Sequence, residues 1–191
     1  MLSEAAARWL LVLHTAVGAA AVGAATHLAI WTRRVVRGDA GRLRAVRRFA
    51  WIVLACQAGA FVAGNAMYPT YKVEVRAASL EDRAAIAAAE AAHADTLARL
   101  ARREGVAPPA PGATTTSIKR AAAAARWFDV KEHWVALGLL ASLGLVLALA
   151  FWDPRRAPEL GSIVLGLTVV VAGTVWLGAI IGILTASWRA V

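Results

Sequence analysis

Only one of the 191 residues is a cysteine, Cys56, so the chain cannot form an internal disulfide or bind zinc or an iron–sulfur cluster through grouped thiolates. Charge is scarce as well. Charged residues make up 17% of the chain, whereas 60% of the residues are hydrophobic and the mean hydropathy is +0.59. This balance lies outside the range of soluble domains and predicts an integral membrane protein. Cys56 is then most simply a small packing residue within a span.

Motifs for soluble-enzyme chemistry are also missing. The alanine-rich polar region 71–126 contains no phosphate-binding glycine loop, no nucleophile–base set and no metal-ligand motif, so nothing indicates a hydrolase or a transferase. The formal charge of +9 is concentrated in one short connection, residues 32–48, which holds seven arginines and one aspartate and therefore carries +6. Local positive charge between two apolar segments is a signal of membrane topology, so no nucleic-acid partner is needed to explain it.

Four apolar segments are long enough to cross a bilayer. They cover residues 9–31, 49–68, 128–152 and 160–188. Pro69 predicts the end of the second segment, because proline cannot continue the helical hydrogen-bond ladder. The sequence therefore predicts an all-α, integral membrane four-helix bundle with an extramembrane helical hairpin between spans two and three. The predicted division is residues 1–70 with spans one and two, 71–126 with the hairpin, and 127–191 with spans three and four.

The polar region between spans two and three has its own helix signals. Ser79 is a plausible N-cap for an alanine-rich helix that runs to Glu104 and stops at Gly105. Residues 106–116, with three prolines, predict a turn or tip. Ser117 is expected to cap a short basic helix, residues 118–126, which continues into the third span.

The arginines predict the orientation. Residues 32–48 and 153–159 are short and arginine-rich, so both connections are expected in the cytoplasm, with both termini and the 71–126 hairpin outside, in the periplasm of a Gram-negative cell. The expected location is the inner (cytoplasmic) membrane. Loop 32–48 would also attract anionic lipid headgroups, at roughly 1 kcal/mol per basic side chain.

Two histidines are predicted at the same depth on different spans. His14 follows Trp9 by five residues and His133 follows Phe128 by five, so each lies about 7–8 Å inside the outer boundary. Ionisable residues inside a membrane are functional candidates. Two imidazoles at one level are what a b-type haem with two axial histidines needs, and Gly18 and Gly138 would leave room for the porphyrin.

Further residues fit around such a haem. Lys72 and Arg76 lie just outside the membrane, where they could pair with haem propionates or with an acidic partner. Tyr68, Asn65 and Glu132 are candidates for a quinone or proton site, and Glu132 could also join the histidines at a copper or non-haem iron site. Asp129 is expected to charge-complement the start of its helix, and Lys131 to extend outward.

These features favour a small membrane cytochrome, or an electron-transfer subunit of an oxidoreductase, that passes electrons between quinol and an external or complex-bound acceptor. The architecture is similar in kind to the haem-carrying four-helix anchors of quinone-linked respiratory enzymes, and the similarity implies haem b and possible quinone binding. No sequence motif carries this similarity.

Three alternatives remain open from the sequence. The histidines could be polar residues that hydrogen-bond across helices. The chain could be a cofactor-free accessory subunit of a larger respiratory-type membrane complex that docks through its external helices. A transporter is the third alternative, although the sequence lacks the paired broken helices and the inverted repeat that would support it. His27 lies about 20 Å deeper than His14, beside the arginine-rich boundary, and is expected to have an interfacial or structural role. His93, on the external helix, is expected to serve packing or docking.

Overall fold

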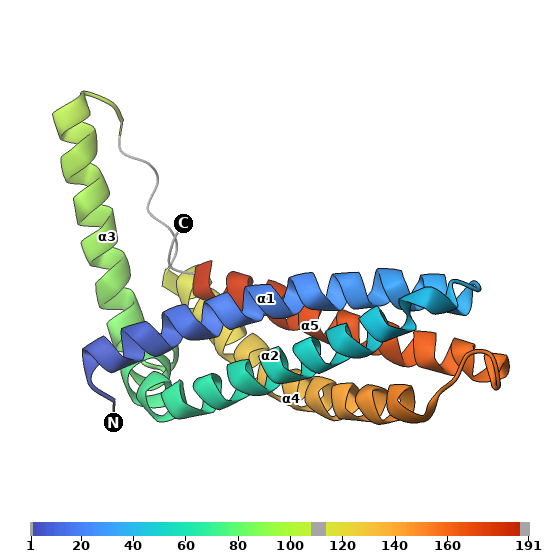
Figure 1. Ribbon diagram of the computed structural model, residues 1–191. Helices are drawn as coiled ribbons and strands as arrows, with labels where there is room; N and C mark the ends of the chain where they lie inside the picture. Colours follow the sequence, from blue (N-terminus) through green and yellow to red (C-terminus); the bar gives the residue numbers. More distant parts are fainter. Residues whose placement is uncertain (1, 108–113, 188–191) are drawn as a thin grey trace.

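In the computed structural model, which describes residues 2–107 and 114–187, the described residues form helices and short connections and contain no strand (Figure 1). Four helices are long and apolar enough to cross a membrane. They belong to α1 (Glu4–Val36), α2 (Leu43–Thr70), α4 (Thr114–Phe151) and α5 (Gly161–Ser187). The predicted all-α bundle with four spans is therefore confirmed. Trp188, the predicted end of the fourth span, and most of the predicted 106–116 tip lie outside the described residues.

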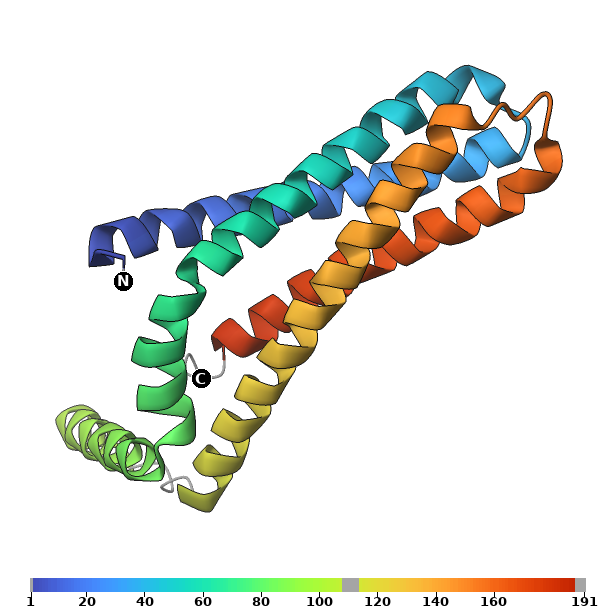
Figure 2. The same cartoon turned by 90° about the horizontal axis from the view of Figure 1, so that it is seen from below.

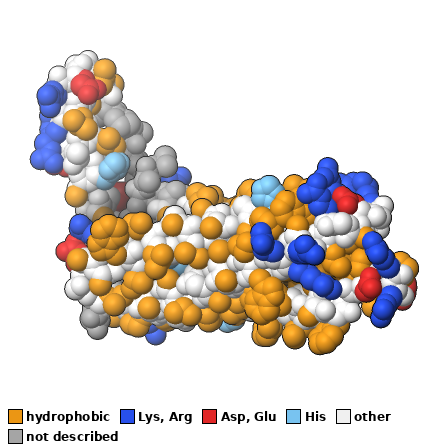
Figure 3. All heavy atoms as spheres, in the orientation of Figure 1, with side chains coloured by type: hydrophobic (Ala, Val, Ile, Leu, Met, Phe, Trp, Pro, Cys, Tyr) orange, Lys and Arg blue, Asp and Glu red, His pale blue; other side chains and the backbone are white. Residues whose placement is uncertain are grey.

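The four long helices form a closed ring of neighbours. Helix α1 packs against α2 and α5, and α4 packs against the same two helices, so α1 and α4 lie on a diagonal. Figure 2 shows the helices close together at the end that carries the arginine-rich loop and spread apart toward the other end. Hydrophobic side chains cover the flank of the bundle, and charged side chains gather at the arginine-rich end and on α3 (Figure 3). This distribution suits a bundle surrounded by lipid.

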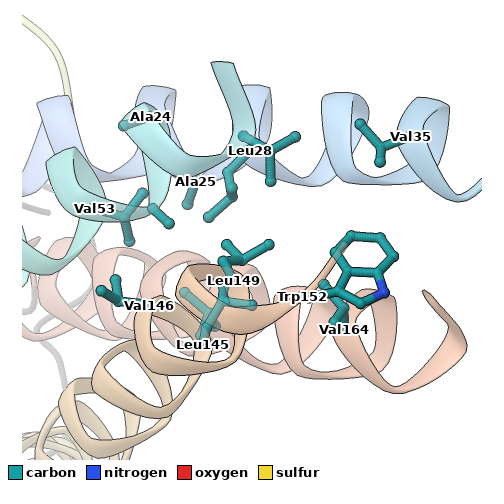
Figure 4. Packing of buried hydrophobic residues seen from close by; sticks show 13 residues of the cluster. Ala24, Ala25, Leu28, Val35, Val53, Leu145, Val146, Leu149, Trp152 and Val164 are labelled. Carbon is teal, nitrogen blue, oxygen red and sulfur yellow. The ribbon is translucent and has the colours of Figure 1, made fainter. Parts of the chain in front are cut away.

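The main buried core lies in the half of the bundle nearest the arginine-rich loop (Figure 4). All four long helices contribute to it, with Leu28, Val53, Leu149 and Val171 among its fully buried side chains. Arg47 of α2 donates from Nε to the Leu149 carbonyl at 2.8 Å and from Nη2 to the Trp152 carbonyl at 3.0 Å. Because the last carbonyls of a helix have no partner within it, these bonds both satisfy the end of α4 and tie it to α2.

Pro69 does not end the second helix, so the predicted stop is wrong. Helix α2 continues through Pro69 to Thr70 and passes directly into η2, a π-helix over Tyr71–Glu81, and Figure 2 shows the chain bending in this region. Proline removes one backbone donor, and a helix accommodates such a loss by bending or by local π-type widening. The helical rod therefore extends beyond the apolar segment.

The external helix α3 (Arg83–Glu104) begins later than predicted. Asp82, and not Ser79, is its N-cap: the Asp82 carboxylate accepts hydrogen bonds from the backbone N–H groups of Ala84 and Ala85 at 2.9 and 3.1 Å. Ser79 is unavailable for this role because it lies within η2. Gly105 ends the helix as predicted, with a left-handed φ of 68°.

Helix α3 lies across the bundle axis. It extends sideways from the end opposite the arginine-rich loop, and it is seen nearly end-on in the turned view (Figures 1 and 2). A small apolar cluster fixes its base and consists of Leu80, Ile86, Ala121, Ala124 and Ala125. Ser117, the predicted cap, lies inside helix α4, which is helical from Thr114, the first described residue after the gap, and runs without a break into the third span, as expected.

Candidate functional site

The register of α4 decides which of its polar residues enter the bundle. Its inward face carries four residues at helical spacing, Lys131, Val135, Gly138 and Ser142. Contacts with α5 or α2 show the direction of the last three. Val135 lies against Gly178 of α5, Gly138 against Thr174 of α5, and Ser142 donates a hydrogen bond to Gln57 of α2 at 2.8 Å. Lys131, four residues before Val135, lies on this same face.

His133 lies on the other side of α4. Two residues correspond to about 200° around a helix, so His133 is nearly opposite Lys131. Its side chain is exposed, and its Nδ1 pairs with the carbonyl of Asp129 in its own helix at 2.8 Å. His133 therefore faces the surroundings of the bundle.

His14 is half-buried and faces α2. Its Nδ1 donates to the Ala60 carbonyl at 2.9 Å, and a Cβ atom placed on Gly64 would lie 3.5 Å from its Cε1. A glycine at position 64 thus lets the imidazole approach the α2 backbone. This is the interhelical polar contact that the sequence left open as an alternative.

A haem shared by His14 and His133 does not fit this arrangement. One ring is seated against α2, and the other points away from the bundle on the diagonally placed helix. The space expected for a porphyrin at Gly138 is filled, because a Cβ atom there would lie 2.7 Å from Oγ1 of Thr174. Gly18 has open space around it, with nothing within 4 Å of an added Cβ. Among the described residues, no group of three or more histidine, cysteine or acidic side chains could hold a metal ion.

Lys131 takes the inward position that the sequence gave to His133. Its ammonium lies 5.5 Å from the centroid of the Phe128 ring, and a Cβ atom on Gly182 of α5 would be 3.5 Å from it. It also lies close enough to interact electrostatically with His14 of α1. Extension of the Lys131 side chain toward the outer surface stays a prediction, but its ammonium lies between α4 and α5 and is not directed toward the lipid. The sequence does contain a signal for this rotation of α4. The small residues Gly138 and Ser142 share a helical face with Lys131, and small residues mark the face on which membrane helices pack closely.

The hairpin base brings another group together. The Arg76 guanidinium bridges two carboxylates: it lies 2.6 and 3.2 Å from the two oxygens of Asp129 and 2.7 Å from Glu81. Tyr71 stacks on Phe128, with ring centroids 4.1 Å apart. Arg76 therefore serves to hold η2 against α4. Asp129, which was expected to complement the charge at the start of its helix, thus forms an ion pair with Arg76.

The remaining candidates are placed separately by their own contacts. Asn65 is exposed and donates to the Phe61 carbonyl of its own helix at 2.9 Å. Tyr68 lies with its ring centroid 6.4 Å from that of Tyr71. Glu132 is half-buried beside the Lys131 and Asp129 charges, and Lys72 is exposed on η2. A shared quinone or proton site of Tyr68, Asn65 and Glu132 stays a prediction.

Comparison of the chain with protein-family models, with curated proteins and with solved structures finds no match to any of them.

Proposed function

We propose that this protein is an accessory subunit of a larger membrane assembly and that α3 is its docking element. The observation that carries the proposal is the position of α3, which extends sideways past the flank of the bundle (Figure 1). With the four long helices across a bilayer, α3 would run along the membrane surface, where neighbouring subunits are within reach.

The contacts of α3 support this role. The helix is anchored near its start by Ile86, which belongs to the apolar cluster with Leu80 and α4, whereas its next turns carry exposed small side chains, including Ala88, Ala91 and Ala92. An alanine-rich face adds little apolar burial within this chain, but it permits close approach of another helix. His93 is exposed on the same stretch and fits the predicted docking role.

The proposed placement is the inner membrane, with residues 32–48 and 153–159 in the cytoplasm and α3 on the outer side. The arginine excess of the two short connections supports this orientation. Loop 32–48 would contact anionic lipid headgroups there.

A photoreactive amino acid introduced at Ala88 or Ala92 tests the docking role in intact cells. We expect a discrete adduct with a second polypeptide, identified by mass spectrometry. The same group at Leu140, which is exposed on the lipid-facing flank, is the control and should give mainly lipid adducts. Adducts only with a second copy of this chain, or only with lipid, from both α3 positions would contradict the proposal.

A further inference from the structure

An open pocket of about 910 Å³ lies at the arginine-rich end of the bundle. Its lining combines four arginines, Arg42, Arg44, Arg47 and Arg48, with the aromatic rings of Trp31 and Phe49. The pocket is thus formed by the end of α1, the loop and the first two turns of α2. Cationic and apolar surfaces meet at this site.

The four arginines differ in their partners. Arg42 lies 3.7 Å from Asp39, and Arg47 is bound to the carbonyls at the end of α4. For Arg44 and Arg48, the described part of the chain provides no ion pair or hydrogen bond. Both are exposed and are four residues apart on α2, so they lie on one face of the helix. Two neighbouring guanidinium groups are therefore available to an external anion.

The aromatic side chains of the pocket contact one another. Trp31 and Phe49 meet edge to face, with centroids 4.5 Å apart, and His27 lies within 5.8 Å of both rings. Aromatic side chains favour the boundary between hydrocarbon and headgroups. Trp31 and Phe49 therefore give the pocket an apolar surface beside Arg44 and Arg48.

We propose that this pocket is a specific binding site for an anionic phospholipid. Arg44 and Arg48 bind the phosphate, because guanidinium groups match phosphate oxygens in charge and geometry. The upper part of an acyl chain lies along Trp31 and Phe49. The proposal deepens the lipid contact proposed above for loop 32–48, and it does not depend on docking by α3.

Two double variants with equal charge test the site. R44Q/R48Q removes the proposed phosphate ligands, whereas R33Q/R37Q removes two exposed arginines of the same connection that do not line the pocket. Each purified protein, in neutral detergent, is titrated with phosphatidylglycerol or phosphatidylcholine, and bound lipid is counted by native mass spectrometry. Circular dichroism and gel filtration establish that both variants are folded.

We expect the original protein and R33Q/R37Q to retain one phosphatidylglycerol in preference to phosphatidylcholine. Loss of two arginine contacts should weaken that binding by roughly 30-fold in R44Q/R48Q. Equal losses in the two double variants would overturn the proposal, since they would indicate diffuse attraction to the whole loop. Equal retention of the two lipids would overturn it as well, and so would complete displacement of phosphatidylglycerol by an equal concentration of inorganic phosphate. Failure of this test leaves the α3 adducts unaffected, so the two proposals are separable.

Discussion

At the scale of single residues, a buried polar pair links two helices of the bundle. Ser142 of α4 and Gln57 of α2 are 2% and 6% exposed, and the hydroxyl donates to the amide oxygen at 2.8 Å. In lipid, water is not available to replace a lost partner. The pair is therefore expected to contribute to the alignment of α2 with α4.

Replacing Ser142 with alanine should lower stability by about 1 kcal/mol, because the Gln57 amide oxygen loses its buried donor. Thermal unfolding in detergent measures the change. S162A is the matched control, since Ser162 is exposed and bonds only to the nearby Glu159 carbonyl. If Q57L, S142A and the combined variant have additive effects, the two side chains do not interact as described.

The histidines lead to a second prediction at this scale. Because His14 binds α2 while His133 faces outward, we expect no α-band typical of haem with two axial histidines in the dithionite-reduced protein, even when haem is supplied during expression. An absorption spectrum of the purified protein measures this directly. An α-band that disappears in both H14A and H133A would restore the electron-transfer function predicted from the sequence.

The residue scale is also where prediction from sequence was weakest. The depth of a residue in the membrane follows from counting residues along the helix. His14 and His133 were therefore predicted at the same depth, because each follows a boundary residue, Trp9 or Phe128, by five positions. Rotation about the helix axis does not follow from counting. It depends on which face packs, and at α4 the close contact of Gly138 with Thr174 turns Lys131 inward and His133 outward.

At the scale of elements, α4 and α5 are held together by close backbone approach. The side chain of Thr174 packs against the backbone at Gly138, and the side chain of Val135 packs against the backbone at Gly178. A Cβ atom added to Gly178 would lie 3.3 Å from Cγ2 of Val135. Small residues are the usual means of helix association in membranes, where apolar side chains gain little from leaving lipid. Glycine at these two positions therefore sets the distance between the helices.

G138A should destabilise the protein by about 1–3 kcal/mol, because the new methyl group would overlap Thr174 and force the helices apart. G144A, on the same helix, is the matched control: nothing lies within 4 Å of its added Cβ, and alanine should be neutral or favourable there. Urea or heat unfolding in detergent compares the two variants. Equal stability of G138A and the original protein would show that this contact does not set the spacing.

The sequence correctly predicted one helix end, at Gly105, but not the other, at Pro69. The Gly105 stop follows from local backbone chemistry and was found. The stop at Pro69 was not, because α2 continues through the proline into the π-helix η2, and Arg76 of η2 pairs with Asp129 of α4. Long-range contacts of this kind outweigh a local helix-breaking preference, and they do not follow from a single segment of sequence.

At the scale of the whole molecule, the fold itself was predictable. Four apolar segments, each long enough to cross a bilayer, leave few arrangements other than a bundle. The sequence did not predict the order of neighbours around the bundle, or the concentration of the core at the arginine-rich end. Both depend on side-chain packing between helices distant in sequence, such as the buried cluster to which Val53 of α2 and Leu149 of α4 both belong.

The orientation of the whole chain is tested with single cysteines. In a C56A background, E159C and R103C place one thiol at each end of the bundle, both at exposed positions, and position 103 lies away from the proposed docking stretch. A membrane-impermeant maleimide applied to intact spheroplasts should label R103C and leave E159C unlabelled until the membrane is permeabilised. Labelling of E159C alone would reverse the proposed topology.

The crosswise position of α3 has a consequence for spacing in the membrane. A helix of 22 residues is about 33 Å long. If α3 lies along the membrane surface, as proposed, it adds roughly 10 Å, its width and not its length, to the height of the protein above the lipid. It would also widen the area that one molecule occupies on that side, so the length of α3 would set a minimum lateral distance to any neighbouring protein that cannot fit beneath or beside it.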